Sequence, residues 1–176
     1  MRLSLVFPFI MAGLAGCAVP VPVPAPAPAR APIARPAATA GAYPRMESRI
    51  LALVNAERKS RGLHPLVLNE RLDQAAKLHA SNMATYKKMS HVLPESRVPT
   101  LTHRAQYVAY PYAMIAENIA LGFSDAESVV RGWMESPGHR RNILSPEAVE
   151  IGTGVVSSKS GGLYFCQVFG RRLTSI

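Results

Sequence analysis

Ile151-Gly-Thr-Gly-Val-Val-Ser157 and Leu163-Tyr-Phe-Cys-Gln-Val-Phe-Gly170 are the two stretches that decide the fold class. Both are rich in β-branched and aromatic residues, and the linking Ser158-Lys-Ser-Gly-Gly162 is typical of a hairpin. The chain before them shows helical spacing of its apolar residues instead. Helices first and strands last, without alternation of the two, predict an α+β domain with an antiparallel sheet.

Five helices are expected upstream of these strands. They run from Met46 to Gly62, from Asn69 to about Lys88, from Thr100 to Tyr110, from the capping box Ser124-Asp-Ala-Glu127 onward, and from Pro137 to Leu144. Leu63 to Leu68 is interpreted as a short apolar link between the first two helices. Trp133 is expected to be an anchor of the core.

The N-terminus has the pattern of an exported bacterial lipoprotein. Arg2 precedes an apolar stretch from Leu3 to Gly13, which is shorter than the roughly 20 residues of a transmembrane helix. Leu14-Ala-Gly-Cys17 resembles a lipobox, in which the cysteine thiol becomes acylated. We therefore expect residues 1–16 to be a signal peptide. Cys17 would then anchor the mature chain, outside the cytoplasm, to the cell membrane or the outer membrane.

Residues 17–42 form a Pro/Ala-rich linker that cannot bury a core. At about 3.1 Å per residue, a polyproline II spacer of this length spans on the order of 75 Å. Residues 43–176 remain, enough for one domain with one substantial core. Three of the chain's 20 Lys and Arg residues precede Tyr43, so the domain has 17 of them against 11 Asp and Glu, a net charge of +6.

This basic surplus favours anionic partners such as phospholipid headgroups or acidic wall polymers. We expect the membrane as a partner through the lipid anchor, peptidoglycan or lipid as ligands, no nucleic acid, and a monomeric domain. The chain has two cysteines, so an acylated Cys17 leaves Cys166 without a disulfide partner. Cys166 lies in an apolar run and is expected to be a buried small residue, so the fold must rest on its hydrophobic core.

The candidate residues of a functional cleft are His91, Glu117, Glu135 and His139. Two imidazoles and two carboxylates can bind a divalent metal, with His91 and His139 as candidate zinc ligands, or can act as acid and base. His139 lies near a helix start, where the helix dipole is expected to lower its pKa. His79 is expected on the inner face of the second helix, as a core residue outside the site. Glu117 and Asn118 also have a structural interpretation, in which they bond backbone in a buried turn.

Several short motifs follow one another over residues 46–170 in a recognisable order. They are Asn55-Ala-Glu-Arg58, Gly62-Leu63 with Pro65-Leu66, Ala76 with His79, Ser90-His91, Ala116-Glu-Asn-Ile-Ala120, Trp133-Met-Glu-Ser-Pro-Gly-His-Arg140, Asn142-Ile-Leu144, Ile151-Gly152 with Gly154-Val155, and Gln167-Val-Phe-Gly170. This order resembles the bacterial branch of the CAP superfamily (SCP/PR-1-like).

The resemblance implies an α-β-α sandwich, with a central antiparallel sheet between helical layers and a shallow cleft lined by His and Glu. By position, His91 matches the first His of that cleft, Glu117 the Glu of a Glu-Asn-Ile motif, and His139 the second His. Glu135 departs from the family pattern, since many bacterial relatives carry Asn there. The cleft therefore holds either a tetrad or a triad.

Three functions are compatible with these residues. The first is a binding module of the cell envelope that takes up a lipid, a sterol-like molecule or a wall fragment. The resemblance supports this function, because CAP relatives are associated with the binding of sterols and fatty acids. The second is a hydrolase of peptidoglycan or protein that uses His and Glu, with or without zinc, although the chain has no His-Glu-x-x-His signature. The third is a module that recognises another envelope protein. The sequence leaves open whether the protein is an enzyme.

Overall fold

The computed structural model describes residues 43–173. Its elements in chain order are α1 (Pro44–Lys59), β1 (Val67–Leu68), α2 (Glu70–Tyr86), α3 (Leu101–Tyr107), β2 (Tyr112–Leu121), α4 (Ala126–Glu135), α5 (Pro137–Ile143), β3 (Glu150–Ser157) and β4 (Leu163–Arg172). Within this part of the chain, no helix combines the length and the apolar character needed to cross a membrane. The predicted signal peptide, the lipidation of Cys17 and the Pro/Ala-rich linker lie outside the described residues.

The helix starts follow from side-chain caps. The Asn69 side chain accepts hydrogen bonds from the backbone N–H groups of Arg71 and Leu72, as the predicted cap of α2 should. The cap of α4 differs by one residue from the prediction. Asp125, and not Ser124, accepts the bond from the backbone N–H of Ser128, at 2.7 Å, because an ionised carboxylate is the stronger acceptor for a helix N-terminus.

The sheet has the strand order β1-β3-β4-β2. The strands β3 and β4 form the predicted antiparallel hairpin, and β2 pairs antiparallel with the other side of β4. The two-residue strand β1 runs parallel to β3, within the segment that the sequence presented as a link between helices. The prediction of an α+β fold with an antiparallel sheet is confirmed for the three long strands.

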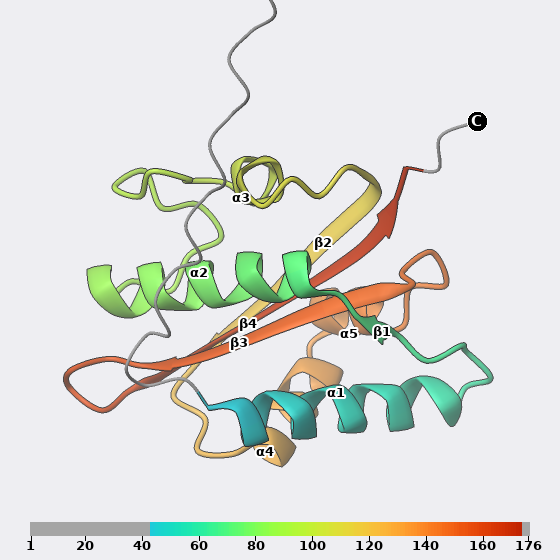
Figure 1. Ribbon diagram of the computed structural model, residues 1–176. Helices are drawn as coiled ribbons and strands as arrows, with labels where there is room; N and C mark the ends of the chain where they lie inside the picture. Colours follow the sequence, from blue (N-terminus) through green and yellow to red (C-terminus); the bar gives the residue numbers. More distant parts are fainter. Residues whose placement is uncertain (1–42, 174–176) are drawn as a thin grey trace, which may run out of the picture. The chain divides into compact units, whose positions relative to one another are not determined.

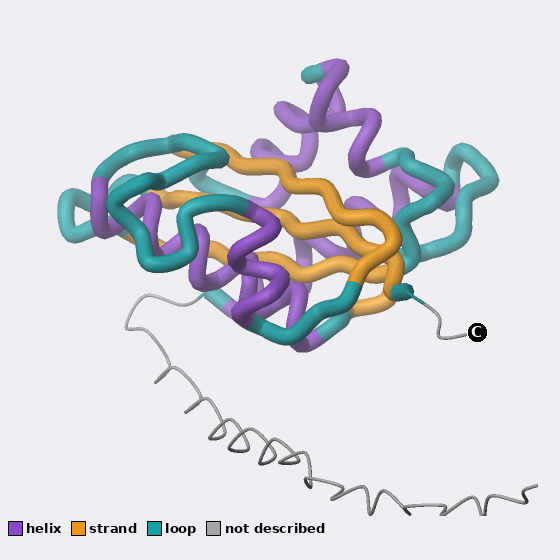
Figure 2. The backbone as a smooth tube through the Cα atoms, turned by 90° about the horizontal axis from the view of Figure 1, so that it is seen from above, coloured by secondary structure: helices purple, strands orange, loops and turns teal. Residues whose placement is uncertain are grey.

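Helices cover both faces of this sheet. Figure 1 shows α2 and α3 on one side, with α1 and α4 on the other. In Figure 2 the long strands run side by side between the helical layers. This arrangement is the α-β-α sandwich that the resemblance implies.

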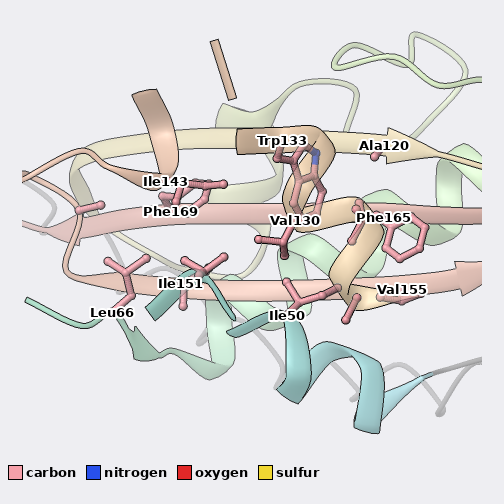
Figure 3. Close-up of a cluster of buried hydrophobic side chains, with 14 residues drawn as sticks. Ile50, Leu66, Ala120, Val130, Trp133, Ile143, Ile151, Val155, Phe165 and Phe169 are labelled. Atoms are coloured by element: carbon pink, nitrogen blue, oxygen red, sulfur yellow. The ribbon is translucent and has the colours of Figure 1, made fainter. Parts of the chain in front are cut away.

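The layer of α1 and α4 packs on the sheet through a cluster of large apolar side chains (Figure 3). Trp133 is 2% exposed and meets the Phe165 ring edge-to-face, with the ring centroids 6.5 Å apart. Its indole N–H donates to the backbone oxygen of Ile119 on β2, at 3.2 Å. The prediction that Trp133 anchors the core is confirmed.

The opposite layer is built on two glycines of β3. A Cβ atom at Gly152 would lie 2.0 Å from the backbone of Leu72, and one at Gly154 would lie 2.6 Å from the backbone of Lys77. Only glycine therefore lets α2 lie directly on the sheet. This close approach brings His79, on the buried face of α2, toward the centre of the sheet.

A buried arginine holds the short helix α5 in place. The Arg58 side chain is 1% exposed and donates to four backbone oxygens, at 2.9 Å (His64), 2.7 Å (Ile143), 2.8 Å (Ser145) and 3.2 Å (Ala148). Ile143 is the last residue of α5, where backbone oxygens have no partner within the helix, and Ser145 and Ala148 lie in the segment that follows it. Arg58 thus fixes the helix that carries His139.

Candidate functional site

Glu117 lies in the middle of β2, and its side chain is 3% exposed on the face that α2 and α3 cover. One carboxylate oxygen, Oε1, lies 2.8 Å from Nδ1 of His91 and 3.6 Å from Nε2 of His79. The other, Oε2, accepts from Nη2 of Arg104 at 2.6 Å. The structural interpretation of a buried turn is wrong, because both Glu117 and Asn118 belong to a strand and the Glu117 carboxylate bonds to side chains. The expected bond to backbone is confirmed for Asn118, whose side chain donates to the backbone oxygen of His139.

The neighbours of Glu117 keep it ionised. Burial raises the pKa of this carboxyl, but the hydrogen bond from His91 and the positive charge of the Arg104 guanidinium help to outweigh burial, and the pKa lies below its ordinary 4.5. Burial also lowers the pKa of His79 to about 4. At neutral pH His79 is therefore uncharged, and Arg104, which is 0% exposed, is the buried positive partner of Glu117.

His91 lies in the segment between α2 and α3, and 55% of its side chain is exposed. An ionised carboxylate can only accept, so Nδ1 of His91 carries a proton and donates it to Glu117. The bond fixes the ring orientation and leaves Nε2 available to water or a ligand. When the ring is neutral, Nε2 is a hydrogen-bond acceptor and a base.

A second network fixes α5 against β2. Nδ2 of Asn118 donates to the backbone oxygen of His139, at 3.1 Å. Nδ2 of Asn142 donates to the backbone oxygen of Glu117 at 3.2 Å and to Oδ1 of Asn118 at 2.9 Å. The Glu117-Asn118 pair thus links both predicted histidines, His91 through its carboxylate and His139 through the next residue.

His139 lies on α5 and is partly buried. Its pKa is lowered, mainly by burial and then by the nearby charge of His91. The predicted direction is confirmed, but its cause is burial rather than the helix dipole. His91 bonds to Glu117, and the backbone of His139 bonds to the next residue, Asn118, so both histidines are held at the same part of β2. We call this pair, His91 and His139, the imidazole rim.

Glu135 does not join this cluster. It is the exposed last residue of α4, and its carboxylate bonds to no other side chain among residues 43–173. Two residues along a helix turn a side chain about 200° around the axis. Because Trp133 points into the core, Glu135 points away from it. A role for Glu135 in the cleft stays a prediction.

Two residues of the cluster were missed from the sequence. The sequence predicts that His79 is a core residue outside the site; its burial is confirmed, but its Nε2 lies 3.6 Å from Oε1 of Glu117, so it belongs to the cluster. Arg104 has no such signal, because a lone arginine in a short helix gives no indication of burial.

Cys166 is buried as predicted, with Sγ 3.6 Å from Oε2 of Glu117. Burial raises the pKa of its thiol well above the ordinary value, so it is not a reactive nucleophile.

The cluster does not fit a resident zinc ion. Protein zinc sites use three or four protein ligands, and no group of three or more His, Cys, Asp or Glu within residues 43–173 is arranged to hold a metal. Both oxygens of Glu117 are already bonded, one of them to the cationic Arg104. This leaves only the two imidazoles of the rim as candidate ligands, and their zinc binding stays a prediction.

Sequence comparison identifies relatives over most of the domain. The model of the cysteine-rich secretory protein family, CAP, matches residues 51–169. The uncharacterised protein YkwD of Bacillus subtilis (strain 168) is 36% identical over 125 residues, which are 71% of this chain and 47% of that protein. The chain thus spans less than half the length of the curated relatives it matches.

Solved structures agree with this result. An extracellular protein with an SCP domain from Bacillus anthracis (strain Ames) superposes with a TM-score of 0.66 at 26% identity, over 73% of this chain and 41% of that one. An outer surface protein of Borrelia burgdorferi shares the fold, with a TM-score of 0.67 at 21% identity, over 73% of this chain and 94% of that one. The structural neighbours are extracellular or surface proteins. Together with the family match over residues 51–169, they show that the chain belongs to the bacterial branch of the CAP superfamily.

Proposed function

We propose that this chain is a lipid-anchored, extracytoplasmic CAP-domain protein that binds a lipid or cell-wall ligand at the imidazole rim. The observation that carries the proposal is the bonding of Glu117. Its two oxygens bond to His91 and Arg104, at 2.8 and 2.6 Å, and its pKa is lowered. Glu117 therefore positions His91 for a ligand and has no proton to donate at neutral pH.

The chemistry around Glu117 suits binding better than bond cleavage. A general acid must hold a proton near the working pH, and Glu117 does not. A cysteine nucleophile must form a thiolate, and the buried Cys166 thiol resists ionisation. The groups that remain accessible are imidazole nitrogens, which donate and accept hydrogen bonds.

The charge near His139 supports an anionic ligand. Arg140 and Arg141 follow it on α5, and both are exposed. Neither forms an ion pair with an acidic side chain among residues 43–173. With the domain's net charge of +6, these arginines favour the phosphate of a lipid headgroup or the carboxylates and phosphates of wall polymers.

Sedimentation with purified envelope material tests this function. A chain that begins at Tyr43 avoids binding through the leader or a lipid. It would be spun with peptidoglycan, with phosphatidylglycerol vesicles and with phosphatidylcholine vesicles. We expect co-sedimentation with peptidoglycan or the anionic vesicles, weakened at least about tenfold by His139→Ala, which removes a rim contact. The matched control His64→Ala removes an exposed histidine elsewhere. Equal binding by all three proteins, or no binding to any material, would contradict the proposal.

The lipid anchor has its own test. Cys17 follows a lipobox-like motif, and acylation would hold the protein in a membrane fraction. We expect the full-length chain to fractionate with bacterial membranes and its Cys17→Ser variant to be released from them. Mass spectrometry of the N-terminal peptide should show a diacylglyceryl group on Cys17. An unmodified Cys17 in membrane-bound protein would refute the anchor.

One observation supports a second function, hydrolysis. The Glu117–His91 pair is a carboxylate-oriented imidazole whose free Nε2 is a base, which could activate water. The sedimentation experiment separates the two functions when the supernatant is also analysed. Released wall fragments that disappear in His91→Ala would establish a hydrolase, whereas sedimentation without fragments supports the binding module.

A further inference from the structure

The segment 86–92, which contains His91, exposes several apolar side chains to solvent. Nine large apolar or aromatic side chains are exposed among residues 43–173, and three of them lie in this short segment. They are Tyr86 (41% exposed), Met89 (51%) and Val92 (47%). Met89 and Val92 flank His91 along the chain, so this imidazole of the rim lies within an apolar stretch. Such a concentration beside a candidate site indicates an interaction surface.

Hydrogen bonds hold this segment in its conformation. Lys87 ends α2 in the left-handed conformation, with φ 52°, and its backbone N–H donates to the backbone oxygen of Met83. The Tyr86 hydroxyl donates to the backbone oxygen of Glu95 at 2.9 Å. The bond from His91 to the buried carboxylate of β2 holds the middle of the segment against the sheet. The apolar side chains are therefore exposed by the fold itself, and a partner needs little reordering to meet them.

The same segment is basic. Lys87 and Lys88 are both exposed, and the segment 86–92 contains no acidic residue. Nζ of Lys88 lies 3.3 Å from Oε1 of Glu95, but both side chains are about half exposed, at 49% and 47%, so this pair is weak. Lysines beside aromatic and apolar side chains are typical of surfaces that lie at the interface of an anionic bilayer.

A second exposed apolar patch, on and beside β1, has a different charge. Val67, Leu68 and Val149 are 65%, 53% and 45% exposed. Glu150 is the register partner of Val67, and Glu70 begins α2. This patch therefore places carboxylates beside its apolar side chains, which an anionic surface disfavours. The two patches lie at opposite ends of α2 (Figure 1), whose 17 residues span about 25 Å.

We propose that the segment 86–92 docks the domain on an anionic lipid bilayer. Met89 and Val92 enter the headgroup region, the two lysines contact lipid phosphates, and His91 lies at the level of the headgroups. This inference rests on the proposed function and selects a lipid surface as its partner, because a polar wall polymer has no use for exposed apolar side chains. The proposed anchor at Cys17 would keep the domain near a bilayer, so a weak affinity of this surface is enough for docking.

A fluorescent label at position 89 tests the docking. The expected mature chain, residues 17–176, would have Cys17→Ser, so that it has no acyl group and its one native thiol is the buried Cys166. Met89→Cys or the control Val67→Cys is labelled with the environment-sensitive dye NBD. Each protein is mixed with phosphatidylglycerol vesicles, with phosphatidylcholine vesicles or with peptidoglycan. We expect a blue shift and brighter emission at position 89 with phosphatidylglycerol alone, and neither change at position 67.

Three results of this experiment would overturn the proposal. The first is no shift at position 89 with phosphatidylglycerol. The second is an equal shift at both positions, which would indicate contact with the bilayer in no fixed orientation. The third is an equal shift with phosphatidylcholine or a shift with peptidoglycan, which would assign the surface to another partner.

Lysine variants with matched charge test the electrostatic part. Lys87→Gln with Lys88→Gln should raise the phosphatidylglycerol concentration at half of the shift by roughly fivefold for each lysine removed. Lys59→Gln with Lys159→Gln removes the same charge from two exposed positions elsewhere and should change this concentration much less. Equal effects of the two pairs would overturn the proposal.

The results also distinguish this inference from the proposed function. Binding to peptidoglycan that His139→Ala weakens, without a shift at position 89, would retain the proposed function and overturn the docking surface. No binding to any envelope material and no shift at position 89 would contradict both.

Discussion

His79→Leu should remove a large part of the acid sensitivity of this domain. The imidazole is 0% exposed, and burial lowers its pKa from 6.5 to about 4 in the folded chain. In the unfolded chain it titrates near 6.5, so between these values the unfolded state binds a proton that the folded state does not. Stability therefore falls as pH decreases from about 6.5 toward 4, and leucine has no proton to bind.

The size of this effect follows from the two pKa values. They differ by about 2.5, and each pKa unit corresponds to about 1.4 kcal/mol, so the wild type should lose about 3 kcal/mol over the window. Most of this, about 2.5 kcal/mol, should be lost by pH 4.5. Protonation of the Glu117 carboxyl causes a separate loss of stability below pH 4.5, because its pKa is lower in the folded chain than in the unfolded chain. Burial raises the pKa of Glu47, so protonation of this carboxyl favours the folded state as the pH falls. This contribution is the same in the wild type and in the His79→Leu variant.

Urea unfolding followed by Trp133 fluorescence measures the difference, since this is the chain's one tryptophan and it is buried. The chain that begins at Tyr43 and its His79→Leu variant would be compared at several pH values from 7.5 to 4.5. Between pH 7.5 and pH 4.5, the free energy of unfolding of the wild type should fall by about 2.5 kcal/mol more than that of the His79→Leu variant. A His103→Leu control, at an exposed position, should follow the wild type. Parallel pH profiles for wild type and His79→Leu would refute the reasoning.

Three further predictions concern stability. Arg58→Met should lower the free energy of unfolding by about 3 kcal/mol, because four backbone oxygens lose their donor, and a melting temperature unchanged within a degree or two would contradict this. Gly152→Ala should lower the free energy of unfolding by about 3 kcal/mol or prevent folding, because its Cβ would overlap the backbone of α2. In the same urea titration, Gly138→Ala should be close to neutral, because its Cβ meets only ordinary contacts. Glu117→Gln should cost roughly 3–5 kcal/mol at neutral pH because it leaves Arg104 buried without its counterion, and a neutral effect in thermal unfolding would show that the pair is hydrated.

The elements with clear periodicity could be predicted from the sequence. The apolar spacing before Gly62, the cap at Asn69 and the hairpin at residues 158–162 all act locally, so their signals do not depend on the rest of the fold. The strand β2 could not be recognised in this way. It is Tyr112-Ala-Met-Ile-Ala-Glu-Asn-Ile-Ala-Leu121, which is covered on both faces and does not alternate between apolar and polar residues.

The candidate site was predictable only in part for a related reason. His91, Glu117 and His139 were found because the family motifs mark them, and the structure links all three through β2. Arg104 gave no local signal, because its burial depends on a carboxylate that lies on a different element. A buried charge can be recognised only when its partner is known, and pairing across elements is a property of the fold.

The most direct test of the central claim is an NMR titration of the imidazole nitrogens in the chain that begins at Tyr43. Soluble peptidoglycan fragments and phosphatidylglycerol micelles would be added in separate experiments. The account predicts that the signals of His91 and His139 move together with one of these ligands, while those of the exposed His64 and His103 stay in place. Shifts confined to His64 or His103, or rim signals that no ligand moves, would contradict it.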